Sequence, residues 1–202
     1  MEGTTFYLIF WTLWIFLTFF IDRQNPYRLK LSIIVLIAIF LSEFHYDLGN
    51  DQLYASGFFL LLITYFLFSR EKRSTIIYSF ICSYIVTLSY VSFHLFEIYD
   101  PIWIIINKQW MIGIFLGYLV IILQKSLKGR LLIILSGTMQ GEILYAYILK
   151  KYQFPYSIGG FDYLDVLSLI TMLLVGWSCF ENAGFIFQNH FHFNGKAKQK
   201  SS

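Results

Sequence analysis

Charged side chains are scarce in this chain of 202 residues. Asp, Glu, Lys and Arg make up only 13% of it, whereas soluble domains contain about a quarter. Hydrophobic residues reach 57%, and the mean hydropathy is +0.62. This composition excludes an ordinary soluble domain and predicts an integral membrane protein.

Cysteine is almost absent as well. The two cysteines, Cys82 and Cys179, both fall inside apolar runs. Isolated cysteines at such positions exclude a disulfide framework and a zinc site. No two histidines have the HxxxH or HExxH spacing, so we expect no metal and no cofactor.

Motifs for nucleophilic catalysis and phosphate binding are missing. The chain has no GxSxG sequence, and its one Gly-Gly pair, Gly159-Gly160, is typical of a turn. The basic residues form short clusters between apolar runs and no continuous stripe, so nucleic acid is not an expected partner. Nothing in these patterns indicates an enzyme.

Long apolar runs are abundant. A membrane-spanning helix needs about 20 apolar residues, within a range of roughly 17 to 25. Seven runs come near this length: Thr4–Ile21, Leu29–Phe44, Leu53–Ser69, Thr75–Phe96, Gln109–Gln124, Leu131–Leu149 and Tyr163–Phe185. The fold class is therefore predicted to be all-α, an integral membrane bundle of seven transmembrane helices at residues 1–187. A short basic tail at residues 188–202 follows it.

The basic residues predict the orientation of the bundle. They gather on alternating connections, and basic residues near helix ends favour the cytoplasmic side. The first, third and fifth connections and the tail each hold three: Arg23, Arg28 and Lys30; Arg70, Lys72 and Arg73; Lys125, Lys128 and Arg130; Lys196, Lys198 and Lys200. The N-terminus is therefore expected outside and the C-terminus in the cytoplasm.

The opposite side is acidic. It holds Glu43, Asp47, Asp51, Glu97, Asp100, Asp162 and Asp165. Carboxylates in connections usually face water, so a solvated rim is expected. A metal site built from Glu43 with His45 and His94 with Glu97 is the less favoured alternative.

Polar residues line one face of the fourth run. Ser79, Ser83, Thr87, Tyr90, His94 and Glu97 fall within about 80° of one another on a helix. Small hydroxyl residues commonly join helices in membranes, which favours packing. The alternative is a hydrophilic path that ends at His94 and Glu97.

Two pairs of glycines are spaced for close helix packing. Gly113 and Gly117 lie in the fifth run, and Gly137 and Gly141 lie in the sixth. A GxxxG pair lets two helix backbones approach closely. Before the fifth run, the segment Pro101–Lys108 is either an interfacial piece or the beginning of the span.

The sixth run contains an ionisable residue away from both of its ends, Glu142. Inserting a charged side chain at the centre of a membrane helix costs about 2.5–3.5 kcal/mol, so an ionisable residue there is by default a candidate functional residue. Thr138 and Tyr145 share its side of the helix. Burial favours the neutral form of this carboxyl group unless a cation pairs with it, and Lys108 and His94 are the two candidate partners. Because polar or small residues nearly encircle this helix, other helices are expected to surround it. The fourth, fifth and sixth helices should form the core, with Glu142 facing inward.

Three segments resemble the YphA-like family of small membrane proteins of Bacillus-type bacteria. They are YVSFHLFEIYDPIWIIINKQWM at Tyr90–Met111, MQGEILYAYILKK at Met139–Lys151 and LVGW at Leu174–Trp177. The similar length and order of segments extend the resemblance over most of the chain. It implies a bacterial plasma membrane and supplies no catalytic residue.

Two functions are favoured as hypotheses, and a third, an intramembrane enzyme, ranks last because no pair of nucleophile and base is visible. The first is a non-enzymatic structural or accessory role, in which the polar faces serve packing or a partner. The second is a transporter or channel for a small solute, ion or proton, with Glu142, His94 and Glu97 on the path. The expected partners are the lipid bilayer and either another membrane protein or a second copy of this chain.

Overall fold

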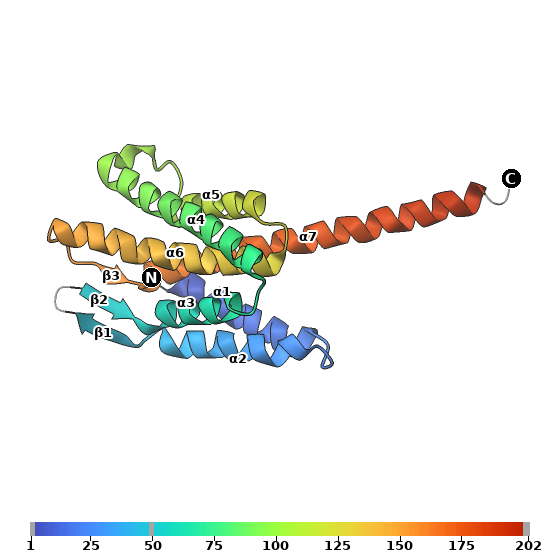
Figure 1. Cartoon of the computed structure of the whole chain (residues 1–202), viewed down its shortest axis with the longest axis horizontal. Coiled ribbons are helices and arrows are strands. Elements are labelled where there is room, and N and C mark those ends of the chain that lie inside the picture. The colour runs from blue at the N-terminus through green and yellow to red at the C-terminus, as the bar shows by residue number, and fades with distance from the viewer. Residues whose placement is uncertain (1–2, 49–50, 200–202) are drawn as a thin grey trace.

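A bundle of helices makes up nearly all of the computed structural model (Figure 1). The model describes the backbone of residues 3–48 and 51–199, and the side chains of residues 3–47, 52–102 and 104–182. Seven α-helices lie within the described residues: α1 (Thr4–Ile15), α2 (Pro26–Leu41), α3 (Ala55–Phe68), α4 (Arg73–Tyr99), α5 (Lys108–Leu123), α6 (Leu127–Lys151) and α7 (Phe161–Gln199). Each predicted run overlaps one of them, and the first run continues beyond α1 as a π-helix, η1 (Phe16–Phe20).

Local sequence signals explain where several helices begin. Asn25 accepts a hydrogen bond from the Tyr27 amide at the start of α2, and Pro26 occupies the first helical position. Asn107 and Ser126 cap α5 and α6 in the same way, accepting from the amides of Gln109 and Gly129. These side chains satisfy amide groups that have no partner inside the helix.

Helix α5 begins at Lys108 and not at Pro101. A short 3₁₀ helix, η2 (Pro101–Trp103), precedes it, and the Asp100 carboxylate caps this turn by accepting from the Ile102 amide at 3.1 Å. Irregular backbone then leads to Asn107. Residues 101–107 are therefore not part of α5, which begins at Lys108.

Three short strands form a small sheet, which the sequence did not predict. Strands β1 (His45–Leu48) and β2 (Asp51–Tyr54) form an antiparallel pair with His45 opposite Tyr54. Strand β3 (Ser157–Ile158) joins β2 in parallel, with Leu53 opposite Ile158. The sheet thus ties the α2–α3 connection to the α6–α7 connection.

The two ends of the bundle differ. One end, here called the sheet end, carries β1, β2, β3 and η2, and the chain begins there (Figure 1). The other, the basic end, carries the connections before α2, α4 and α6, which hold the clustered Arg and Lys residues. Helix α7 runs from the sheet end past the basic end. Of the predicted tail at 188–202, residues up to Gln199 continue this helix, and 200–202 lie outside the described residues.

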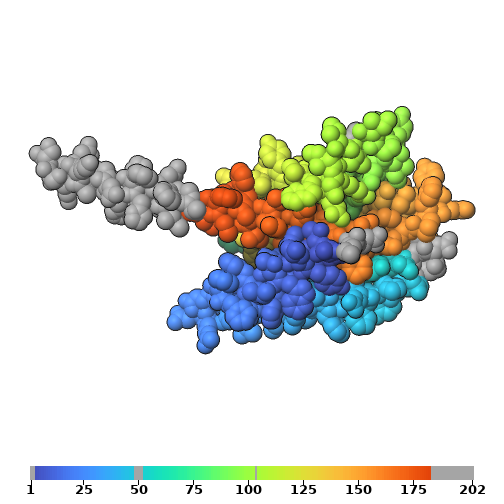
Figure 2. Space-filling view, turned by 180° about the vertical axis from the view of Figure 1, so that it is seen from behind, coloured from blue at the N-terminus to red at the C-terminus, as the bar shows by residue number. Residues whose placement is uncertain are grey.

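Helix α6 occupies the centre of the bundle. It packs against α3, α4, α5 and α7, and its contact with α4 is the most extensive in the molecule. The prediction that other helices surround it is confirmed. The core differs in one respect from the predicted core of α4, α5 and α6. Helix α5 packs chiefly on α7, and α1 covers the other side of α7 (Figure 2).

The α4–α6 seam is closed by polar side chains. The Ser83 and Ser136 hydroxyls bond to each other, and Thr87 donates to the Gly137 carbonyl at 2.9 Å. Ser83, Thr87 and Ser136 are all at most 3% exposed. This stretch of the polar stripe on α4 therefore serves packing, the favoured interpretation.

The candidate glycines lie in different surroundings. A Cβ added at Gly137 would lie 2.7 Å from Val86 Cβ, and one at Gly141 would lie 2.7 Å from the Tyr90 ring, so both face α4. A Cβ at Gly113 would lie 2.6 Å from Leu169 Cδ2 on α7. Gly117 has no described neighbour within 4 Å of such a Cβ, so it does not share in this packing.

Candidate functional site

The Glu142 carboxylate is fully buried near the sheet end, with 0% of the residue exposed. It accepts hydrogen bonds from the Tyr90 hydroxyl, from the Tyr156 hydroxyl at 2.8 Å and from the Gly159 amide at 3.0 Å. These donors come from α4 and from the connection between α6 and α7. The carboxylate therefore joins three segments of the chain.

Backbone geometry places the Gly159 donor. Gly159 follows β3 and has φ +70°, a left-handed conformation that side chains other than glycine rarely adopt. A Cβ there would also lie 3.6 Å from the Tyr54 carbonyl and 3.7 Å from Gly57 Cα. The predicted turn at Gly159-Gly160 is thus the element that presents an amide to Glu142.

Neither candidate cation forms an ion pair with Glu142 among the described residues. Lys108 pairs instead with Glu97 at 2.9 Å, and the same Glu97 oxygen lies 3.3 Å from His94 Nδ1. Tyrosine hydroxyls and an amide satisfy Glu142, because α4 turns Tyr90 toward it and the α6–α7 connection folds back over it. Glu97, His94 and Lys108 form a separate cluster between α4 and α5.

A cavity of about 510 Å³ links these groups at the sheet end. Four helices and the α6–α7 connection line it with Tyr90, His94, Asn107, Lys108, Gln109, Glu142, Tyr145, Tyr156, Asp162, Tyr163 and Val166. Asn107 and Asp162 are exposed, so the cavity opens to the surface there. Its volume lies in the range of small-molecule sites.

Of the six candidate polar residues, four line this cavity directly: Glu142, His94, Tyr145 and Lys108. The other two adjoin it. Glu97 contacts Lys108 and His94, and Thr138 lies 3.3 Å from the hydroxyl of the lining residue Tyr163 while donating to the Ile134 carbonyl. The structure thus brings all six together.

Aromatic rings form one wall of the cavity. His94 lies between Tyr90 and Tyr145, with ring centroids 4.5 Å and 5.1 Å away. Tyr156 then meets Tyr145 edge-on at 5.1 Å. Burial, together with the neighbouring Glu142 carboxylate, raises the pKa of Tyr156 far above its usual range, so this phenol stays neutral and donates at physiological pH.

One polar atom in this wall has no partner. His94 is 5% exposed, and its Nε2 makes no hydrogen bond within the described part of the chain. Buried polar atoms of this kind are rare in native structures, and each needs an explanation. A molecule in the cavity that His94 lines would supply one.

Several residues of the site were missed by the sequence analysis. Tyr156 lies in a connection without periodicity, and Tyr163 and Val166 looked like ordinary apolar positions of the last run. Asp165, assigned to the solvated rim, is 2% exposed and accepts from the amides of Gly3 at 3.0 Å and Phe6 at 2.7 Å. That assignment was wrong because the carboxylate caps the first turn of α1.

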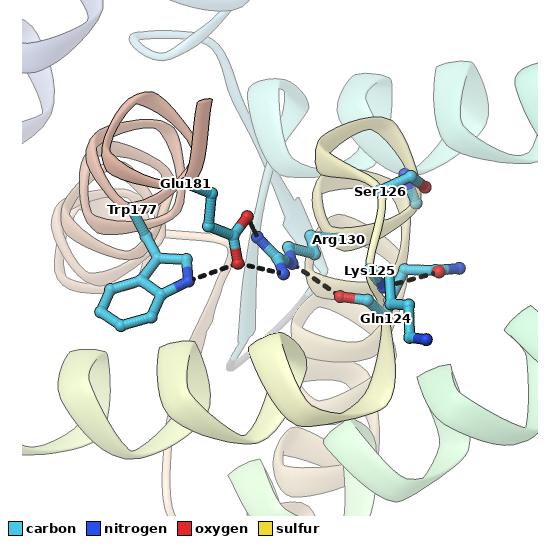
Figure 3. A network of polar contacts seen from close by, with 7 residues as sticks. Gln124, Lys125, Ser126, Arg130, Trp177 and Glu181 are labelled. Carbon is cyan, nitrogen blue, oxygen red and sulfur yellow. Dashed lines mark hydrogen bonds and ion pairs between the residues drawn. The ribbon is translucent and has the colours of Figure 1, made fainter. Parts of the chain in front are cut away.

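A second polar network lies toward the basic end (Figure 3). Arg130, only 3% exposed, donates two hydrogen bonds to the Glu181 carboxylate at 2.8 and 3.0 Å, and a third to the Gln124 carbonyl. Trp177 also donates to Glu181, at 2.7 Å. This network fixes the beginning of α6 to α7 and contains none of the candidate residues.

A larger cavity, of about 800 Å³, lies between α4 and α5. Its lining is mainly apolar, with Ser89, Ser92 and Asp100 as the polar members. It touches none of the six candidates, and apolar surface of this kind suits lipid chains. The smaller polar cavity is therefore the candidate site.

Comparisons with known proteins give a consistent assignment. A family model described as "YphA-like integral membrane protein" matches residues 2–200. The chain is 28% identical over 187 residues to "Uncharacterized protein YphA" of Bacillus subtilis (strain 168), and the match covers 90% of each protein. No solved structure matches.

Proposed function

The chain belongs to the YphA-like family of integral membrane proteins, and from this premise we propose a function for the cavity. The protein is a non-enzymatic accessory protein of the bacterial plasma membrane. It spans the membrane seven times, with the N-terminus outside and the C-terminus in the cytoplasm. It binds a small polar solute at the outer face, in the cavity of the sheet end.

The arrangement of the helices supports this topology. Three of them, Arg73–Tyr99, Leu127–Lys151 and Phe161–Asn182, are long and apolar enough to cross a membrane. Three shorter apolar helices, Thr4–Phe20, Ala55–Phe68 and Lys108–Leu123, run beside them along the same axis, as does α2 (Figure 1). A bilayer accommodates short spans by local thinning. Because the connections rich in Arg and Lys gather at the basic end, this end faces the cytoplasm.

The single observation that carries the proposal is the polar cavity with its unpartnered His94 Nε2. It opens at the sheet end, beside exposed Asn107 and Asp162. The hydrogen-bonded seam of Ser83, Thr87 and Ser136 lies between it and the basic end. This closure favours a binding site over the alternative, a transporter or channel.

Binding should appear as solute-dependent stabilisation of the purified protein. We expect at least one of four probes, choline chloride, glycerol, sodium phosphate or sodium glutamate, to raise the thermal unfolding midpoint of the wild type. At a concentration about 100 times Kd, the stabilisation approaches about 2.7 kcal/mol. Tyr145→Leu should weaken binding about tenfold, because Tyr145 lines the cavity and is 6% exposed. At the same probe concentration, the stabilisation should then fall to about 1.4 kcal/mol.

Tyr147→Leu is the matched control. Tyr147 lies on the same helix, is 72% exposed and does not line the cavity, so this variant should keep the shift. If none of the four probes stabilises the wild type, the binding function is contradicted. If proteoliposomes accumulate the stabilising probe, the protein is a transporter and the accessory role is wrong.

A further inference from the structure

The acidic and basic groups that line the cavity do not all pair with one another. One amine and two carboxyl groups line it: Lys108, Glu142 and Asp162. Lys108 pairs with Glu97 at 2.9 Å. The ion pairs found among the described residues do not include Asp162, so the exposed carboxyl group at the mouth is available to a cation.

The lining is also rich in aromatic rings. Tyr90, Tyr145, Tyr156 and Tyr163 contribute four phenol rings from α4, α6, α7 and the α6–α7 connection. The face of an aromatic ring attracts a cation, most strongly where water is excluded. Tyr90, Tyr145 and Tyr163 are each at most 6% exposed, which meets that condition.

His94 adds a directional group. Its Nδ1 lies 3.3 Å from the Glu97 carboxylate, an acceptor that suits a proton on this nitrogen. In the neutral ring with the proton on Nδ1, Nε2 is an acceptor, and Nε2 is the buried atom without a partner among the described residues. An occupant of the cavity therefore needs positive charge and a hydrogen-bond donor.

We propose that the cavity binds a small organic ammonium ion that carries a hydroxyl or N–H donor. The tyrosine rings hold the cationic group, and Asp162 attracts it at the mouth. His94 Nε2 accepts the donor. This inference rests on the proposed function and specifies its ligand class.

The chemistry fits a free solute and the amine head group of a lipid equally well. Both sources reach an opening at the outer face of a membrane. The two sources can be told apart, because a lipid head group competes with a free ammonium ion for the cavity only when that lipid is present in the membrane. The test therefore includes membranes with and without an amine lipid.

Isothermal titration calorimetry in phosphatidylglycerol nanodiscs, which contain no amine, tests the proposal. Choline is expected to bind at least about tenfold more tightly than 3,3-dimethyl-1-butanol, its uncharged carbon isostere. Tyr145→Leu and Asp162→Asn should each weaken choline binding by about tenfold. Tyr145→Phe keeps the ring and should stay within about threefold of the wild type.

Two controls guard against indirect effects. Asp47→Asn removes an exposed carboxylate of β1 that does not line the cavity, so it should leave binding unchanged. Asp162 is itself exposed, so its variant tests the charge even if Tyr145→Leu fails to fold. Adding phosphatidylethanolamine to the nanodiscs should weaken choline binding if a lipid head group is the natural occupant, and should leave it unchanged if a free solute is.

Equal binding of choline and its uncharged isostere would overturn the ammonium assignment. Binding of glycerol or phosphate without binding of choline would also overturn the ammonium assignment. The proposed solute-binding function would survive that result. If choline, glycerol, phosphate and glutamate all fail to bind, both proposals fall. The two failures are therefore distinguishable.

Discussion

Replacing Glu142 by leucine is expected to lower the free energy of unfolding by about 3 kcal/mol or more. The substitution removes the only acceptor that the structure gives to the Tyr90 hydroxyl, the Tyr156 hydroxyl and the Gly159 amide. Each buried donor that loses its partner costs about 1–3 kcal/mol. Glu142→Gln keeps one acceptor oxygen and should cost less.

Gln140→Leu provides the control for this experiment. Gln140 lies two residues earlier on the same helix and donates an exposed hydrogen bond to the Tyr65 hydroxyl at 2.8 Å. It also accepts a long hydrogen bond from Thr87 at 3.5 Å, but Thr87 keeps the Ser83 and Gly137 carbonyls as acceptors without it. Its variant should stay within about 0.5 kcal/mol of the wild type. Chemical unfolding in detergent micelles measures both, and a Glu142→Leu protein as stable as Gln140→Leu would show that the carboxylate does not hold the α6–α7 connection.

Gly137→Leu is expected to prevent the folded bundle from forming. Even the first added carbon would lie 2.7 Å from Val86 Cβ and 2.8 Å from the Ser83 carbonyl oxygen, a backbone atom that cannot rotate away. Gly137→Ala should therefore lower the free energy of unfolding by about 1–3 kcal/mol, the usual cost of overpacking. The leucine variant adds three more carbons to the same seam.

Gly117→Ala is the matched control, since it is the same change in the other GxxxG pair. An added Cβ there meets nothing described within 4 Å. Because alanine favours a helix more than glycine, this variant should be unchanged or up to about 1 kcal/mol more stable. Equal changes in stability at the two positions would show that the contact of Gly137 with α4 carries no cost of its own, and would contradict close packing of α4 on α6.

The two glycine pairs show what a sequence pattern can predict. Spacing by four residues places both members on one face of a helix, but it does not say whether a neighbour covers that face. Gly137 and Gly141 meet α4, whereas Gly113 meets α7 and Gly117 meets open space. The neighbour depends on tertiary arrangement, which the spacing does not contain.

The helices themselves were predictable from apolar runs, and the central place of α6 followed from its nearly encircling polar and small residues. The partners of Glu142 were not predictable. Tyr156 and Gly159 lie in a connection where no periodicity marks a direction, and a two-residue strand positions them. Asp165 was missed for the same reason, since the amides of Gly3 and Phe6 lie more than 150 positions away in the chain.

We propose that the cavity opens to the outside and is closed toward the cytoplasm by the α4–α6 seam. Labelling of thiols in intact and in permeabilised cells with a membrane-impermeant maleimide tests this topology. The background chain keeps the buried Cys82 and has its exposed Cys179 replaced by serine. We expect Asp162→Cys to react in intact cells and Lys128→Cys to react only after permeabilisation. Ser83→Cys should react neither in intact nor in permeabilised cells. Labelling of Ser83→Cys from the cytoplasmic side, or labelling of Asp162→Cys only after permeabilisation, would contradict it.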